Sequence, residues 1–310
     1  MKGRILILGA AGRLGRASAR AFRDAGWTVV SLVRPGAGWR AEPNTIVVED
    51  DGLHREAVLE AAPGADVVLH AMNPPYVAWQ KDTLALADIA IAAAEKAGAT
   101  LLFPGNVYNF GKTMPALLDE QTAMQPSGRK GALRFEMEQR LRAASERGVR
   151  TIVLRAGDFY GGAARGSWFD LIIARDVSLG LVRYPGPLNV VHSWAYLPDL
   201  AQAMVRVAAA RASFGQFEAF GFPGHAVTGM EMIGAVQRAV GRQLQRKTFP
   251  WLAIHAFSPF VAHWRELSEI AYLWRMPHRI DGTRLKGAIG EIPQTSFQQA
   301  VTTALDPLSR

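Results

Sequence analysis

Three glycines near the start of the chain have the spacing of a phosphate-binding turn. Gly9, Gly12 and Gly15 are three residues apart and directly follow the short apolar run 5–8. In such a turn the first glycine lets the chain leave a strand sharply, the second lets backbone N–H groups approach a pyrophosphate, and the third allows close helix–strand packing. The following helix presents its free N–H groups to the anion. We therefore predict dinucleotide binding at Gly9, Ala11, Gly12, Arg13, Leu14 and Gly15.

The end of the next apolar run indicates which dinucleotide binds. Arg34 follows the run 28–33. An acidic residue there would hydrogen-bond the ribose 2′-hydroxyl of NAD, whereas an arginine accommodates the 2′-phosphate of NADP. We therefore predict NADP(H), with NAD as the alternative, and we expect Arg13 and Arg40 to add positive charge near that phosphate.

Two aspartates follow the third apolar run and are candidates for the adenine end of the cofactor. The run 45–48 leads through Glu49 into Asp50 and Asp51. We expect Asp51 to lie beside the adenine amino group, and Asp50 is a close competitor for that role.

Strand-like and helix-like segments alternate around these residues. Short β-branched or apolar runs alternate with segments of helical spacing, which favours a doubly wound parallel α/β sheet of the Rossmann type. The expected strands are 5–8, 28–33, 45–48, 67–70, 100–103 and 151–155. The expected helices are 17–25, 54–62, 83–96, 133–147 and 199–210.

The alternation weakens after Arg155, where glycine and proline interrupt the chain. We predict a Rossmann domain over 1–165, with 188–212 returning to it and Val190–His192 adding a strand. A smaller, mostly helical C-terminal substrate lobe is expected over 166–187 and 213–310.

Composition limits the other classes of function. The 310 residues include no cysteine, which excludes disulfides and thiol chemistry. No uncharged apolar run approaches the roughly 18 residues that cross a membrane, and the N-terminus lacks a signal-peptide pattern. The net charge of +8 is spread along the chain without a dense basic block. We expect a cytoplasmic protein that binds a small-molecule substrate and neither nucleic acid nor membrane, and we predict no metal site.

The sequence resembles the extended short-chain dehydrogenases/reductases of the NAD-dependent epimerase/dehydratase type. The resemblance rests on the glycine turn, Asp51 before 55–58, and the segments 64–71, 106–108, 154–161 and 192–201. It implies that Ala71, Met72 and Asn73 line the nicotinamide ribose. It also implies that 156–159 approaches the nicotinamide or the substrate, and that relatives dimerise through paired helices, here 83–96 and 133–147.

The chain departs from this family's catalytic pattern, which is a serine followed by Tyr-x-x-x-Lys. The tyrosine position falls on Lys130 and the lysine position on Arg134, while Asn106 is the nearest polar side chain to the serine position. In the family the tyrosine transfers a proton, and the lysine lowers the pKa of that tyrosine and holds the ribose.

Three interpretations of this departure remain open. Lys130 acts as the acid, kept neutral by burial and by the nearby charge of Arg134, or it contacts ribose and phosphate alone. Alternatively, a tyrosine from elsewhere reaches the site, with Tyr108, Tyr76 and Tyr160 as candidates. In the third interpretation the protein holds the cofactor without hydride chemistry.

The leading hypothesis is therefore an NADP(H)-dependent oxidoreductase, epimerase or dehydratase acting on a sugar-like or other carbonyl or alcohol substrate. The alternative is a catalytically silent NADP(H)-sensing or binding protein. Two further features remain open: His192, for which a structural role is favoured over a place in the cleft, and the aromatic segment 251–274, which is read as a packed face, a lid or a dimer contact. Glu266 and Glu269 interrupt that segment's apolar pattern and argue against a membrane-surface role.

Overall fold

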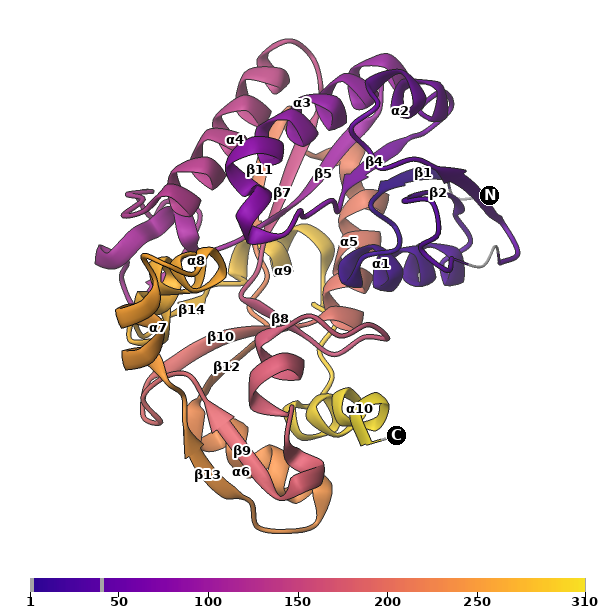
Figure 1. The fold of residues 1–310 in the computed structure, drawn as a ribbon. Coiled ribbons are helices and arrows are strands. Elements are labelled where there is room, and N and C mark those ends of the chain that lie inside the picture. The colour runs from indigo at the N-terminus through magenta and orange to yellow at the C-terminus, as the bar shows by residue number, and fades with distance from the viewer. Residues whose placement is uncertain (1–2, 40–41, 310) are drawn as a thin grey trace.

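A seven-stranded parallel sheet forms the upper part of the molecule in Figure 1. The structure is a computed structural model that describes residues 3–39 and 42–309. In spatial order the strands are β11 (Phe217–Gly221), β7 (Thr151–Arg155), β5 (Thr100–Gly105), β4 (Val67–His70), β1 (Arg4–Leu8), β2 (Thr28–Val33) and β3 (Thr45–Glu49). The predicted doubly wound α/β sheet is confirmed.

Helices cover both faces of this sheet because its central strands are apolar on both sides. In β1, Ile5 and Ile7 pack into one buried cluster, whereas Leu6 and Leu8 pack into the other. The first face carries α1 (Arg13–Asp24), α5 (Leu197–Ala210) and α9 (Thr283–Ile289), and the second carries α2 (Arg55–Ala61), α3 (Trp79–Ala97) and α4 (Arg129–Glu146). Among the helices described, none is long and apolar enough to cross a membrane.

A smaller lobe lies below the carboxyl edge of the large sheet (Figure 1). Its three-stranded sheet contains β8 (Asp158–Tyr160), β10 (Val191–Tyr196) and β12 (His225–Thr228), and a second pair joins β9 (Leu181–Tyr184) to β13 (Gln245–Thr248). Its helices include α6 (Gly229–Val240) and α10 (Phe297–Ser309), while α7 (Trp251–Phe257) and α8 (Ala262–Ile270) project at one side. Beside them, β6 (Leu117–Leu118) pairs with β14 (Arg279–Ile280).

Two strands belong to different sheets from those that the sequence predicts. Val190–His192 was expected in the large sheet, but β10 pairs with β8 and β12 in the small one. Conversely, β11 lies within the range predicted for the substrate lobe, yet it is the edge strand beside β7. The reason is non-local: both segments have strand sequences, and only the partner strand available in space decides which sheet each one joins.

Three helices begin four residues earlier than predicted, and α5 begins two residues earlier. The first, α1, starts at Arg13 directly after the glycine turn, and α3 extends back to Trp79. The third, α4, starts at Arg129, with Gly128 as its N-cap. The early start of α4 places Lys130 in its first turn.

Candidate functional site

The glycine turn has the geometry that its spacing predicts. Gly9 adopts a φ of +84°, which favours glycine, and its N–H donates to the carbonyl of Leu32 at 3.2 Å. Gly12 is the exposed N-cap of α1. A Cβ on Gly15 would lie 2.2 Å from the carbonyl oxygen of Gly9, so only glycine lets α1 pack this closely on the turn.

The end of β4 lies against the same turn. The N–H of Ala71 donates to the carbonyl of Leu8 at 2.9 Å, and a Cβ on Gly9 would lie 3.0 Å from the backbone of Met72. The structure therefore brings Ala71, Met72 and the exposed Asn73 beside the residues that would hold the pyrophosphate.

Arg34 and Arg16 lie around the loop that follows β2. Arg34 is exposed at the end of the strand. Arg16 donates from Nε to the carbonyl of Ala11 at 2.9 Å and from Nη2 to that of Ala37 at 3.4 Å, and its guanidinium lies 5.1 Å from the centre of the Trp39 ring. The sequence analysis missed Arg16. Its position one turn into α1, facing the β2 loop, could have been read from helical spacing. Arg40 lies outside the described residues.

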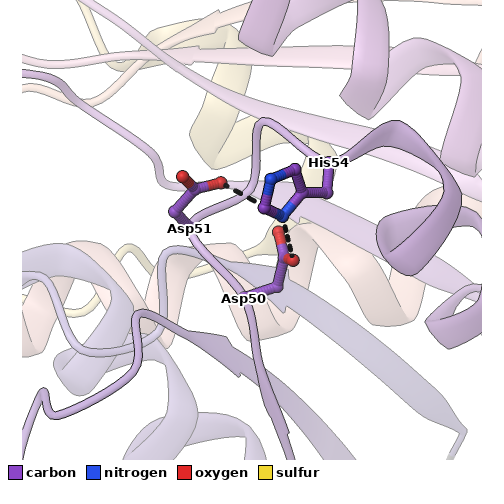
Figure 2. Close-up of side chains that lie close together, drawn as sticks. All are labelled: Asp50, Asp51 and His54. Atoms are coloured by element: carbon purple, nitrogen blue, oxygen red, sulfur yellow. Dashed lines mark hydrogen bonds and ion pairs between the residues drawn. The ribbon is translucent and has the colours of Figure 1, made fainter.

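The two aspartates after β3 have different environments (Figure 2). Asp50 is buried and accepts hydrogen bonds from the Gly52 N–H at 2.7 Å and from Nδ1 of His54 at 2.9 Å. The exposed Asp51 accepts from the Leu53 N–H at 2.8 Å, and the same carboxylate oxygen lies 4.0 Å from Nδ1 of His54. The hydrogen bond and charge of Asp50 raise the pKa of His54. Asp50 is therefore committed to the turn that starts α2, and Asp51 retains a free carboxylate oxygen.

Arg13 points toward the small lobe. Its guanidinium donates to the carbonyls of Ala164 at 3.0 Å and Gly161 at 3.1 Å, and it lies 3.6 Å from the carboxylate of Asp170. Burial lowers the pKa of Arg13, although the charge of Asp170 opposes that change. This differs from the expectation that its side chain adds charge at the 2′-phosphate; the side chain instead joins the glycine turn to the second lobe.

Lys130 stands at the position of the family's tyrosine and is 2% exposed. Its ammonium forms ion pairs with Glu266 and Glu269 of α8, and it lies 5.2 Å from the centre of the Tyr76 ring. Burial disfavours the charged form of Glu266, but the hydrogen bond and charge of Lys130 outweigh burial and lower its pKa. The sequence analysis took these glutamates only as interruptions of an apolar face. Their spacing of three residues placed them on one side of a helix.

Arg134 stands at the position of the family's lysine. Its guanidinium lies between two aromatic rings, 5.3 Å from the centre of Trp79 and 5.2 Å from that of Phe103. Burial lowers the pKa of Arg134. Within residues 3–39 and 42–309 no carboxylate lies within ion-pairing distance of it, so its charge faces the tyrosines described next.

Two of the three candidate tyrosines meet at the site. The hydroxyls of Tyr76 and Tyr108 lie 3.0 Å apart. Burial raises the pKa of Tyr76 to about 12 and raises that of Tyr108 well above its ordinary value. Tyr160 lies instead in the core of the small lobe, where its hydroxyl hydrogen-bonds Nδ1 of His225 at 2.8 Å. The suggestion that Tyr160 reaches the site is therefore wrong: β8 alternates its side chains, and Tyr160 faces the core.

Asn106 orients Tyr108. Its Oδ1 accepts a hydrogen bond from the Tyr108 N–H at 3.0 Å, and its carbonyl accepts from Arg155 at 2.6 Å. Arg155 is also paired with the buried carboxylate of Glu138 at 2.7 Å. Asn106 thus acts on the geometry of the loop, and this buried network fixes β5, β7 and α4 relative to one another.

Comparison with known proteins agrees with this architecture. The family model described as the NAD dependent epimerase/dehydratase family matches residues 5–220. A Streptomyces 3-diazoavenalumate denitrifying reductase is 32% identical over 176 residues, which are 51% of this chain and only 57% of that protein.

Solved structures share the fold over nearly the whole chain. A putative epimerase from Burkholderia cenocepacia has a TM-score of 0.78 at 20% identity, covering 99% of this chain and 98% of that one. The UDP-glucuronic acid 4-epimerase from Bacillus cereus, in complex with UDP-glucuronic acid and NAD, has a TM-score of 0.78 at 13% identity, covering 98% of each chain. With the Rossmann sheet, the glycine turn and a family match over most of its length, this chain belongs to the NAD-dependent epimerase/dehydratase family.

Proposed function

We propose that the protein is an NADP(H)-dependent oxidoreductase that transfers hydride to or from a carbonyl or alcohol carbon in the cleft between its lobes. The observation that carries this proposal is the continuity of the site. The glycine turn, the end of β4 and the Tyr76–Tyr108 pair follow one another along the carboxyl edge of the sheet, where ligands of open α/β sheets bind.

The residues present fit a nicotinamide dinucleotide. The exposed Gly12 opens α1, whose N-terminal N–H groups would hold the pyrophosphate. Asp51 would accept from the adenine amino group, and Ala71–Asn73 would line the nicotinamide ribose. When bound, the cofactor supplies a hydride donor or acceptor at the nicotinamide ring.

We further propose that NADP(H) is preferred over NAD(H). Arg16 and Arg34 flank the loop after β2, and among the residues described neither has a carboxylate within ion-pairing distance. Trp39 stacks near Arg16 and would extend an apolar face toward the adenine. Two unpaired guanidiniums are suited to a phosphate and leave an unphosphorylated ribose without a matched partner.

At the reacting end, the raised pKa values favour neutral hydroxyls for Tyr76 and Tyr108. A neutral hydroxyl donates a hydrogen bond, so we assign the pair to orienting and polarising the substrate oxygen. Lys130 is enclosed by two carboxylates and the ring of Tyr76. That environment favours a positioning role for Lys130 over proton transfer.

The substrate would be a small carbonyl or alcohol compound. The charged side chains Arg13 and Lys130 are already paired within the protein. The aromatic rings of Tyr76, Trp79 and Tyr108 pack against one another beside them. This lining supports a planar or sugar-like body of low charge.

The test combines binding with turnover. NADPH and NADH are titrated by fluorescence, and NADPH oxidation is then followed with keto-sugars, aromatic aldehydes and quinones. Tight NADPH binding with turnover of at least one acceptor supports the proposal. Tight binding with no turnover across the panel favours the catalytically silent sensor, for which the absent Tyr-x-x-x-Lys pattern is the supporting observation.

A further inference from the structure

An acid–histidine pair joins two neighbouring strands of the small sheet, β8 and β10. Asp158 of β8 accepts a hydrogen bond from Nε2 of His192 of β10 at 2.8 Å. The strands approach closely here because residue 157 is a glycine, whose Cβ would lie 2.1 Å from the carbonyl oxygen of Ser193. The Asp158 side chain is 21% exposed and that of His192 only 3%, so the carboxylate is the accessible member of the pair and the imidazole is buried.

His192 is held in one orientation by aromatic side chains. Its ring stacks on Trp274 at 4.5 Å with planes 6° apart, and the ring of His278 meets it edge-on at 4.5 Å. The other ring nitrogen, Nδ1, is buried and has no hydrogen-bond partner among the residues that the structure describes. A ring fixed in this way has one directed interaction, the bond from Nε2 to Asp158.

Asp158 is near groups from both lobes. After burial, its negative charge contributes to the raised pKa values of Tyr76 and Tyr108, which belong to the large lobe. It also acts on Arg13 beside the glycine turn and on Tyr184 of the small lobe. These interactions connect the charge of Asp158 with the tyrosine pair and with the start of α1, where the substrate and the nicotinamide would meet.

We propose that Asp158 is the proton-transfer residue of this site, taking the place of the absent tyrosine, and that His192 is its positioning residue. The inference deepens the proposed oxidoreductase function and rests on it. In the oxidative direction the substrate O–H bond breaks and its proton passes to the free oxygen of Asp158, while the C–H electron pair leaves as hydride to the oxidised nicotinamide. In reduction the same proton returns from Asp158 to the substrate oxygen. In both directions the hydrogen bond from His192 Nε2–H holds the Asp158 side chain in place.

This assignment supplies a proton-transfer group that the other side chains of the site do not provide. Tyr76 and Tyr108 have raised pKa values, so their hydroxyls stay protonated near neutral pH. The ammonium of Lys130 is held in ion pairs with two glutamates. Asp158 is partly exposed, one of its carboxylate oxygens accepts from His192, and among the described residues the other has no hydrogen-bond donor. A carboxylate in this state has the geometry of a general base.

The first test does not need turnover. 4-Nitrophenol, whose ionised form absorbs visible light, is titrated with pH in the presence of wild-type protein and NADP⁺. The carboxylate of Asp158 would accept a hydrogen bond from the neutral phenol and would repel the phenolate. Both effects favour the protonated probe, so we expect the pKa of bound 4-nitrophenol to be about one unit higher than that of the free probe. In Asp158→Asn that shift should disappear. A wild-type protein that leaves the probe's ionisation unchanged, or an Asp158→Asn protein that shifts it equally, overturns the inference.

Turnover then separates the two roles. With any acceptor that the wild type reduces, Asp158→Asn should lower kcat by roughly 10²–10⁴-fold with NADPH affinity preserved. His192→Gln keeps a side-chain donor and should retain more activity than His192→Phe, which keeps the stacked ring but loses the donor.

The matched control is His225→Gln. His225 is a buried histidine in the same small sheet that hydrogen-bonds Tyr160, away from the cleft. Thermal unfolding and NADPH binding check that each variant is folded. Wild-type turnover by folded Asp158→Asn contradicts the inference alone, whereas failure of the wild type to bind NADPH contradicts the proposed function.

Discussion

Among single residues, the lysine and arginine side chains of the candidate site differ in whether a carboxylate is paired with them. Lys130 is paired with Glu266 and Glu269, and Arg13 lies beside Asp170. Arg16 and Arg34 lack such partners within the described part of the chain. Because an unpaired surface cation loses little by meeting a ligand anion, the second group is suited to binding and the first to structure.

The cofactor preference follows from this division. We expect Arg34→Ala and Arg16→Ala each to weaken NADPH binding by roughly 10–100-fold, the loss of one charge-assisted contact, and to leave NADH binding nearly unchanged. Fluorescence titration of both cofactors measures this. Arg20→Ala serves as the control, because Arg20 is an exposed arginine on α1, the helix that carries Arg16. Equal losses for NADPH and NADH would show that the two arginines do not read the 2′-phosphate.

The ion pair of Lys130 makes a different prediction. Lys130→Met removes the buried cation of Glu266 and Glu269 and leaves them paired with the half-exposed Arg129; it should lower the free energy of unfolding by about 3 kcal/mol. Arg129→Met removes a half-exposed partner of the same carboxylates and should cost about 1 kcal/mol or less. Urea unfolding compares the two. Similar losses for both variants would mean that burial does not distinguish these pairs.

At the scale of elements, glycine determines how closely helix and strand meet. Gly15 of α1 packs on the turn after β1, and Gly287 of α9 has no heavy atom within 4 Å of the place where a Cβ would stand. The same residue type is therefore a steric requirement in one helix and only an entropic cost in the other.

This contrast gives a matched pair of substitutions. Gly15→Ala should displace α1 from the turn, destabilise the fold by several kcal/mol in the way of an overpacked core, and abolish NADPH binding. Gly287→Ala should stabilise the protein by about 0.5–1 kcal/mol and leave binding intact. Thermal unfolding and NADPH titration measure both. Normal NADPH affinity in Gly15→Ala would contradict the assigned role of the turn.

For the whole molecule, buried histidines predict a sensitivity to acid. Burial lowers the pKa of His70 and of His278 to about 3, whereas the unfolded chain titrates near 6.5. Between these values the unfolded state binds protons that the native state does not, so stability is full above pH 6.5 and falls as the pH decreases toward 3.

Two such groups give a slope of about 3 kcal/mol per pH unit within that window. Urea unfolding at a series of pH values tests this. His70→Leu, in the sheet core beside Phe103, should remove about half of the slope. A pH profile unchanged in His70→Leu would show that His70 does not titrate in this way.

Much of the cofactor end was predictable because it is encoded locally. The glycine spacing, Arg34 and the aspartates after β3 lie within single strand–turn–helix units, where backbone geometry depends on neighbouring residues. The order of strands and helices in the large sheet could likewise be predicted from apolar periodicity. The first residues of α3 and α4 could not, because these helices begin at Trp79 and Arg129, before the apolar repeat starts.

The sequence by itself determined the Rossmann order and the turn that would hold a dinucleotide, since both depend on short-range patterns. Only the tertiary structure decided that β11 joins the large sheet and β10 the small one, that Glu266 and Glu269 close on Lys130, and that Asp158 is backed by His192. Each of these contacts joins residues that are far apart in the chain or in different lobes. Such partners are selected by packing and charge in three dimensions, which no local pattern specifies.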